Sequence, residues 1–358
     1  MKKVYYAGLD IAKNVFQVFL ADERGRELSN RKLSRKQIME FFRTLAPCTV
    51  GIEACATAHY WARTLISMGH EAKLIQPIRV KAFLGHRNKT DAADAKAICE
   101  ALMHPGTRFV KVKTEEQQDK MHFLSRRERL VRNSTEIINQ IRCFLAEHGL
   151  TLPKSRNKFE LNFKVLLEKY WDTFSDKFKR VLEENYAEYL STRKKIQEID
   201  VHIKDIAARD EQCKKIQKIN GIGPLTATAI LAHVGDGKQF QNGRQMAAYL
   251  GLTPREHSSG GKQHLLGISK RGNRQIRTLL VLAAHAVLMG IERRKTDDDG
   301  HPIHLSRLDA WALALKNRIG MVKATVALAN KLARIAWAVL VRGEDFNPAK
   351  AVAAIEAR

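Results

Sequence analysis

The first third of this chain is patterned by short apolar runs, whereas the stretch beyond Glu115 has apolar residues that recur every seven positions. In the first third, short apolar runs are bounded by turn residues, a pattern that predicts strands. The runs cover residues 4–9, 14–21, 27–32, 49–52 and 72–75. Helical spacing predicts helices over 37–45 and 58–68, and the good helix formers around Asp91 predict a third. Strands and helices in this order predict an α/β domain.

Beyond Glu115, apolar residues recur every seven positions in two separate stretches. The repeats are Leu124, Val131, Ile138 and Leu145, then Leu182, Tyr189, Ile196 and Ile203. Sustained heptads predict two long helices of a coiled coil, joined by a basic and polar link around 153–160. An antiparallel hairpin within one chain fits this pattern, and so does a stalk through which subunits meet. We expect a spacer between domains that also helps subunits to associate.

A third, mostly helical unit is predicted from about Ile216 onward. Gly221 and Gly223, in the stretch Ile-Asn-Gly-Ile-Gly-Pro, lie between two apolar helical runs. Such glycines permit a tight turn and leave backbone N–H groups at a helix N-terminus, where a phosphate can bind. The pattern is similar to the helix-hairpin-helix of DNA-binding proteins, and a plain packing corner between helices is the alternative. The remainder is predicted as helices over 275–288 and 305–340, a surface loop over 294–304 and a loose tail after 343.

Composition narrows the class of protein. The chain has 358 residues, which is too many for one ordinary core and predicts two or three domains. Lys and Arg number 62 against 38 Asp and Glu, a net charge of +24. This excess indicates a polyanionic partner, most simply nucleic acid, with an anionic membrane surface as the alternative. No apolar run reaches the roughly 20 residues that span a bilayer, and the basic start leads into a strand pattern unlike a signal peptide.

The five cysteines are an odd number and form no Cys-x-x-Cys pair. This usage predicts reduced, buried thiols in a cytoplasmic protein and argues against a zinc site.

Four acidic residues occupy positions where a metal site is plausible. Asp91 and Asp94 are three residues apart, so on a helix both carboxylates lie on one face. Asp10 ends the first apolar run and Glu53 ends the fourth, and strand ends are where α/β sheets gather ligands. Carboxylate oxygens are ligands that Mg²⁺ prefers. Taken alone, the pair Asp91 and Asp94 is better explained as a solvated acidic turn, and the two strand-end acids favour the metal site.

A basic segment surrounds a serine that two glycines follow. Ser259 precedes Gly260 and Gly261, which leaves its hydroxyl uncrowded on a flexible backbone. The basic residues of the segment are Arg255, Lys262, Lys270, Arg271, Arg274 and Arg277. They are predicted to contact nucleic acid and to hold a phosphate against the serine, while an ordinary turn serine is the alternative.

The order of the N-terminal elements resembles an RNase H-like domain, as in RuvC-type resolvases. Six stretches then follow one another along nearly the whole chain: 8–13, 51–55, 89–95, 221–224, 250–261 and 268–273. Together they resemble DEDD-type transposases of the insertion-sequence one-ten family, which are related to the Piv invertases. The resemblance implies a RuvC-like domain over 1–112, coiled-coil helices over 113–212, a mostly helical transposase domain over 213–345 and a tail over 346–358.

The resemblance also implies chemistry and partners. It assigns Asp10, Glu53, Asp91 and Asp94 to an acidic quartet that binds Mg²⁺, and Ser259 to the nucleophile, with Ser258 adjacent. The implied partners are donor and target DNA, a structured non-coding guide RNA and further copies of the chain, as a dimer or tetramer. The expected location is the nucleoid of a prokaryotic cell. Two alternatives stand: a RuvC-like nuclease in which metal-bound water attacks, and a nucleic-acid-binding protein with an inactive acidic site.

Overall fold

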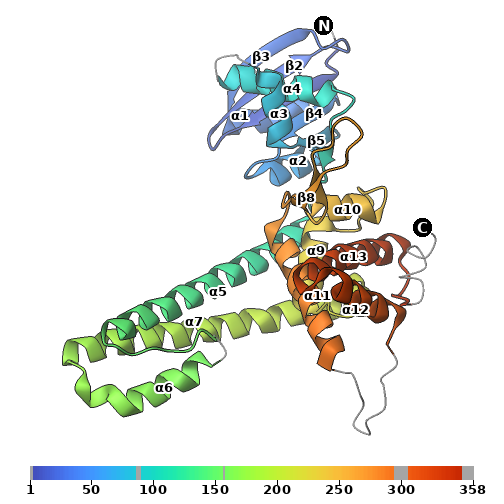
Figure 1. Ribbon diagram of the computed structural model, residues 1–358. Coiled ribbons are helices and arrows are strands. Elements are labelled where there is room, and N and C mark those ends of the chain that lie inside the picture. Colours follow the sequence, from blue (N-terminus) through green and yellow to red (C-terminus); the bar gives the residue numbers. More distant parts are fainter. Residues whose placement is uncertain (1–2, 86–89, 156–157, 294–304, 349–358) are drawn as a thin grey trace. The chain divides into compact units, whose positions relative to one another are not determined.

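The computed structural model describes residues 3–85, 90–155, 158–293 and 305–348 (Figure 1). The chain forms two compact units, Met1–Glu115 and Glu116–Arg358. The first contains a mixed sheet with helices, and the second is mostly helical. A mixed α/β region followed by a helical region is the fold class that the sequence predicts.

A sheet of six strands forms the first unit. The strands are β1 (Tyr6–Ile11), β2 (Val15–Ala21), β3 (Glu27–Ser34), β4 (Thr49–Glu53), β5 (Glu71–Ile75) and β6 (Phe109–Val110). Their order in the sheet is β3-β2-β1-β4-β5-β6, with β1, β4 and β5 parallel and the other neighbours antiparallel. Because β1 and β4 are parallel neighbours at the centre, their carboxyl ends lie at the same edge of the sheet.

Helices pack on both faces of this sheet because strand side chains alternate between faces. The helices are α1 (Arg35–Thr44), α2 (Ala58–Ser67), α3 (Pro77–Leu84) and α4 (Asp91–Met103). In β2, Phe16 joins one core with residues of α1 and α2, and Phe19 joins another with residues of α4. The helix α3 was not predicted. Pro77 follows β5 closely and lies in the first turn of α3, where its missing N–H would have had no partner within the helix.

The second unit begins with a long helical hairpin. Its elements are α5 (Glu115–Glu147), α6 (Phe159–Tyr170), the short 3₁₀ helix η1 (Trp171–Thr173) and α7 (Asp176–Arg209). One apolar cluster joins α5, α6 and α7, and includes Ile138, Phe163 and Leu182. Arg127 of α5 also forms an ion pair with Asp200 of α7. Figure 1 shows α5 and α7 side by side, with α6 near their far end. The sequence predicted a link around 153–160 and no separate element over 161–177, so the helix α6 was not predicted.

The rest of the second unit is a helical bundle with one small hairpin. Its elements are α8 (Glu211–Gln217), α9 (Pro224–Val234), α10 (Gly243–Tyr249), β7 (Pro254–Glu256), β8 (Leu265–Ile268), α11 (Arg274–Arg293), α12 (Arg307–Ile319) and α13 (Met321–Arg342). The predicted helix over 305–340 is interrupted at Gly320, whose φ of 80° is left-handed. The helices α11 and α13 are long and apolar enough to span a membrane, but they pack against each other in one core. The predicted surface loop at 294–304 lies outside the described residues.

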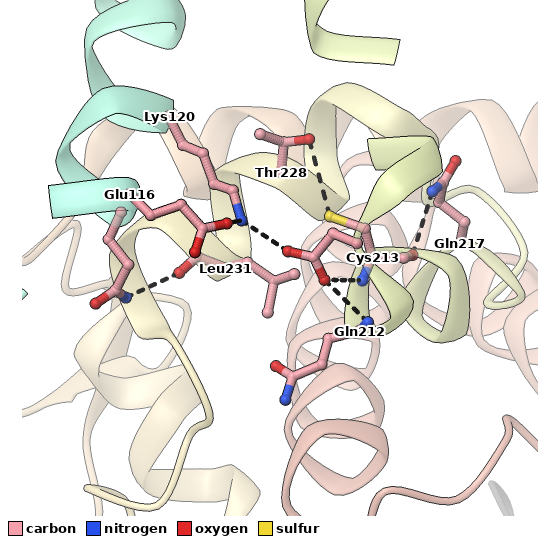
Figure 2. Close-up of polar contacts among 9 residues, drawn as sticks. Glu116, Lys120, Gln212, Cys213, Gln217, Thr228 and Leu231 are labelled. Atoms are coloured by element: carbon pink, nitrogen blue, oxygen red, sulfur yellow. Dashed lines mark hydrogen bonds and ion pairs between the residues drawn. The ribbon is translucent and has the colours of Figure 1, made fainter. Parts of the chain in front are cut away.

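A buried ion pair fixes the start of α5 to the bundle. Lys120 Nζ lies 2.7 Å from Asp210 Oδ2 and 2.8 Å from Glu116 Oε1. Asp210 is also the N-cap of α8, because its other oxygen accepts hydrogen bonds from the backbone N–H groups of Gln212 and Cys213. Figure 2 shows Lys120 reaching from α5 toward this cap. Burial raises the pKa of Asp210, but hydrogen bonds from Lys120 and from the Cys213 N–H outweigh burial, so the pKa lies below its usual value.

The five cysteines are free thiols, as predicted, but they are not all buried. Cys48, Cys99 and Cys213 lie in the cores. Cys55 and Cys143 are exposed, so the expectation of five buried thiols is wrong for these two. Cys55 lies in the loop after β4, and Cys143 lies on the solvent side of α5.

Candidate active site

Two of the four predicted acids stand at neighbouring strand ends. Asp10 is the penultimate residue of β1, and Glu53 is the last residue of β4. The register pairs Gly8 with Gly51, so Asp10 and Glu53, each two residues further on, are level and project from the same face. A Cβ on either glycine would meet atoms of α4. The two acids therefore project from the face that α4 covers.

The other two acids lie in the first turn of α4. Thr90 is the N-cap of this helix, and its hydroxyl accepts a hydrogen bond from the Ala93 N–H at 3.2 Å. The backbone of α4 lies directly on β1, because a Cβ on Gly8 would stand 2.0 Å from the carbonyl oxygen of Ala95. Only glycine at position 8 allows this approach. It places Asp91 and Asp94 near the end of β1. Lys89, which precedes the cap in the sequence motif, lies outside the described residues.

Asp10 interacts electrostatically with the other three carboxylates. The pKa of Asp10 is raised to about 6, first by burial and then by the negative charges of Asp94, Asp91 and Glu53. Like charges held this close favour the binding of a cation, and carboxylate oxygens suit a hard divalent ion. In the ranges that the structure describes, no three or more His, Cys, Asp or Glu side chains already stand together as metal ligands. The donor chemistry nevertheless fits a divalent metal.

Two polar residues that the sequence interpretation missed hold the acidic turn. Gln17 is buried in the apolar strand β2, and its Nε2 donates to Asn30 Oδ1 at 2.6 Å. Asn30 of β3 in turn donates from Nδ2 to the carbonyl oxygen of Ala92 at 3.1 Å. This carbonyl lies between Asp91 and Asp94 in the sequence. The signal was available, because a glutamine within Val15–Ala21 interrupts an otherwise apolar strand and a buried amide needs a partner.

A third missed residue borders the acids. The Cys55 thiol follows Glu53 by two residues. Although the residue is exposed, the pKa of its thiol is raised by partial desolvation and then by the charges of Glu53 and Asp10. The thiol therefore stays protonated beside the acids and is a poor metal ligand in this state.

The predicted serine lies in the hairpin of β7 and β8. Gly260 and Gly261 both have positive φ, 55° and 75°, as the central residues of a type I′ turn do. Ser259 opens this turn, and its carbonyl oxygen accepts from the Lys262 N–H at 3.0 Å. No hydrogen bond to the Ser259 hydroxyl is found in the part of the chain that the structure describes. The neighbouring hydroxyl of Ser258, by contrast, donates to the Glu256 carboxylate at 2.6 Å.

A rigid base of interlocked loops supports the hairpin. A Cβ on Gly272 would stand 1.8 Å from the carbonyl oxygen of Tyr249, and a Cβ on Gly251 would stand 2.2 Å from that of Arg271. Both glycines have positive φ, and so does Lys270 at 54°, which is unusual for a residue with a side chain. Backbone strain of this kind persists only where the surrounding structure imposes it, so the two loops hold a fixed arrangement.

The predicted nucleic-acid contacts divide into two groups. Five of the basic side chains are exposed and available to a phosphate backbone: Arg255, Lys262, Lys270, Arg271 and Arg274. Arg277 is half-buried, and its Nη1 donates to the carbonyl oxygens of Leu250 and Arg271 at 3.0 and 2.9 Å. Arg277 therefore ties the two interlocked loops together.

The glycines of the helix-hairpin-helix pattern also differ from each other. Gly221 has a φ of 88°, and a Cβ there would stand 2.5 Å from a side-chain carbon of Val287, so close packing against α11 explains this glycine. Gly223 is the N-cap of α9 and has open space around it. Phosphate binding at this N-terminus stays a prediction.

Comparison with known proteins identifies the class. Residues 7–149 match a family model described as "Transposase", of the DEDD type, and residues 213–297 match the model "Transposase IS116/IS110/IS902 family". The chain is similar to the transposase for insertion sequence element IS1111A of Coxiella burnetii, with 41% identity over 97% of this chain and 92% of the relative. The transposase for IS1328 of Yersinia enterocolitica is 36% identical over 97% and 100% of the two chains. The pilin gene-inverting protein of Moraxella bovis is 25% identical over 80% and 83%.

The fold and these relatives define an enzyme that cleaves and rejoins DNA. The chain belongs to the IS116/IS110/IS902 family of transposases. The predicted family is thereby confirmed. A DEDD transposase domain also implies the use of a divalent metal in general.

Proposed function

We propose that this transposase cleaves and rejoins the DNA of an insertion sequence through a covalent serine–phosphate link, assisted by Mg²⁺ at the acidic quartet. The observation that carries this proposal is the placement of the acids: Asp10 and Glu53 are level on the face of the sheet that α4 covers, and α4 carries Asp91 and Asp94 in its first turn. The raised pKa of Asp10 agrees with it, because its causes include the charges of the other three acids. Acids of β4 and α4 thus act on Asp10 of β1, although they are up to 84 positions away in the sequence. A coincidental acidic turn does not account for Asp10 and Glu53.

The chain's own residues give this site its form. Asp10, Glu53, Asp91 and Asp94 supply the oxygen ligands, and the Gln17–Asn30 contact holds the turn that carries two of them. A divalent ion bound there would stabilise the negative charge that develops on the scissile phosphate. The nucleophile is a serine of the β7–β8 hairpin, for which the sequence motif predicts Ser259. Serine chemistry keeps the energy of the broken phosphodiester in a new ester, so that a strand can be rejoined to a new partner.

Charge and relatedness support the proposed partners. The net charge of +24 and the five exposed basic side chains around the hairpin fit the phosphate backbones of donor and target DNA. A relative named for inverting a pilin gene supports site-specific recombination as the reaction. The structured guide RNA, the homo-oligomer and the location at the nucleoid rest on the family resemblance, and the same charge suits RNA.

The finer fold assignments also belong to the proposal. The order of strands and helices in the first unit supports an RNase H-like, RuvC-like domain. The heptads buried between α5 and α7 support a coiled-coil spacer, with Leu124, Ile138 and Leu182 among the buried positions. The transposase domain would then begin near α8.

The test is a denaturing gel with end-labelled DNA that carries the ends of the element. We expect the wild-type protein to give a protein-retarded band, and both Asp94→Asn and the double variant Ser258→Ala/Ser259→Ala to give none. DNA binding, measured by gel shift on the same preparations, should stay within a few-fold of wild type, because neither change removes a basic residue. Cleavage without any retarded band in the wild type would instead favour a nuclease in which water attacks.

A further inference from the structure

In the β7–β8 hairpin, one of two adjacent serines, Ser258, makes hydrogen bonds with a carboxylate and with a backbone N–H. Ser258 Oγ lies 2.6 Å from Glu256 Oε1, and the geometry makes the hydroxyl the donor. The two residues are two positions apart on a strand, so their side chains share one face of the hairpin. Ser259, the next residue, points to the other face, where the described structure offers its hydroxyl no partner.

The second contact of Ser258 comes from the opposite strand. The N–H of His257 donates to the carbonyl oxygen of His264 at 3.0 Å, as in an antiparallel ladder. The return bond of that pair, from the His264 N–H to the His257 carbonyl, is absent between these two described residues. The His264 N–H donates to Ser258 Oγ instead, at 3.2 Å. The serine hydroxyl has thus taken the place of a backbone acceptor in the ladder.

We infer that Ser258 is the nucleophile of the strand-cleavage reaction and that the Glu256 carboxylate is the base that accepts its proton. This inference rests on the proposed serine chemistry and names the reacting residues within it. A serine hydroxyl is a weak nucleophile unless a base lies within hydrogen-bond reach, about 2.6–3.2 Å, and Ser258 meets this condition. Ser259 has the motif position but no such base.

The His264 N–H adds to the argument, because it points at the oxygen on which negative charge develops. A fixed backbone donor at that oxygen stabilises the charge as the proton leaves. The two contacts have complementary roles: Glu256 takes the proton, and the His264 N–H stays on the oxygen. The I′ turn and the interlocked loops below it keep the two strands in register, so both contacts exist before DNA binds.

The reaction balances without a further reagent. The Ser258 oxygen attacks phosphorus, and its proton moves to Glu256. A bond forms between phosphorus and the serine oxygen, while the bond from phosphorus to the departing sugar oxygen breaks. That oxygen leaves with the electron pair and takes a proton from solvent. On rejoining, a sugar hydroxyl of the new strand attacks the phosphoserine and gives up its proton to solvent. The bond from phosphorus to the serine oxygen breaks, and Glu256 returns its proton to that oxygen.

The deciding experiment maps the linked residue. The full-length wild-type protein is trapped on end-labelled DNA with its element ends, digested with trypsin and nuclease, and sequenced by mass spectrometry. We expect the nucleotide remnant on Ser258. A remnant on Ser259 would overturn the inference while leaving the proposed serine chemistry intact. If no peptide carries a remnant although DNA is cut, both the inference and the serine part of the proposed function fail.

Variants distinguish a Glu256 that accepts the proton from a Glu256 that only stabilises the hairpin. Glu256→Gln keeps an oxygen that accepts the Ser258 hydrogen bond but cannot take the proton, so we expect adduct formation at saturating DNA to slow by on the order of 100-fold. The DNA dissociation constant and Tm should not change, because both side chains are exposed. The matched control is Glu198→Gln, the same change at an exposed carboxylate of α7, which should form the adduct within a few-fold of the wild-type rate. A Glu256→Gln protein that reacts at the wild-type rate would refute the assignment of Glu256 as the base.

Discussion

Gly8→Ala tests whether the close approach of α4 to β1 assembles the acidic site. The added Cβ would stand 2.0 Å from the Ala95 carbonyl oxygen and 2.8 Å from the Cys99 nitrogen. Both are backbone atoms of α4, which cannot swing aside as a side chain can. The helix would have to withdraw by more than about 1 Å to regain ordinary van der Waals contact.

The expected cost follows from this displacement. Overpacking a well-packed core typically costs about 1–3 kcal/mol. In a domain of about 100 residues this lowers the Tm of the first unit by roughly 5–20 °C. The helix carries Asp91 and Asp94 in its first turn, so the same shift moves both away from Asp10. A misplacement of about 1 Å in a catalytic group costs on the order of 100-fold in rate.

The assay combines thermal unfolding of the full-length protein with the rate of DNA cleavage, measured well below the reduced Tm. Gly106→Ala is the matched control: it lies after α4, its φ is not positive, and its new Cβ meets only side-chain atoms of His104 and no backbone atom. We expect the control to behave as wild type. If Gly8→Ala cleaves DNA and unfolds as the wild type does, the close contact does not position the acids and the reasoning is refuted.

Three further predictions concern the second unit. Lys120→Met leaves Asp210, whose side chain is 21% exposed, without its cation, and should lower the free energy of unfolding by roughly 3 kcal/mol in a denaturant titration. The pKa of Asp210 is lower in the folded protein than in the unfolded chain, where it is about 4. The ionised Asp210 therefore stabilises the fold above that pH, and this stabilisation is lost as the pH falls below it. Lys120→Met, which lacks the partner cation, should lose less stability on acidification than wild type. DNA binding should weaken steeply with salt: a plot of log binding constant against log salt concentration should fall with a slope of about 0.9 for each phosphate contacted on duplex DNA. Replacing Lys270 and Arg271 with Ala should make that slope shallower by about 2. An unchanged slope would exclude these two contacts. Arg277→Ala should instead lower Tm with little change in the salt slope, because its side chain holds loop carbonyls.

The sequence by itself determined the local features of the site. Short apolar runs bounded by turn residues located the main strands, and the acids at two strand ends were visible as the points where those runs stopped. Helical spacing placed Asp91 and Asp94 on one face, and the turn at Gly260 and Gly261 was present only as the alternative interpretation of Ser259. Each of these inferences uses neighbours within a few positions, where backbone geometry alone fixes which side chains share a face.

Other features depend on which segments meet, and only the tertiary structure decided them. The extra helices at 77–84 and 159–170 were missed because their local patterns are weak. The contact of Gln17 with Asn30, the withdrawal of Arg277 from solvent and the hydrogen bond from the His264 N–H to Ser258 all join segments whose register the sequence does not reveal. Gly8 shows the reason most clearly. A glycine in a strand has many local explanations, and only the carbonyl of Ala95, 87 positions away, shows that a side chain there would push the acidic helix from the sheet.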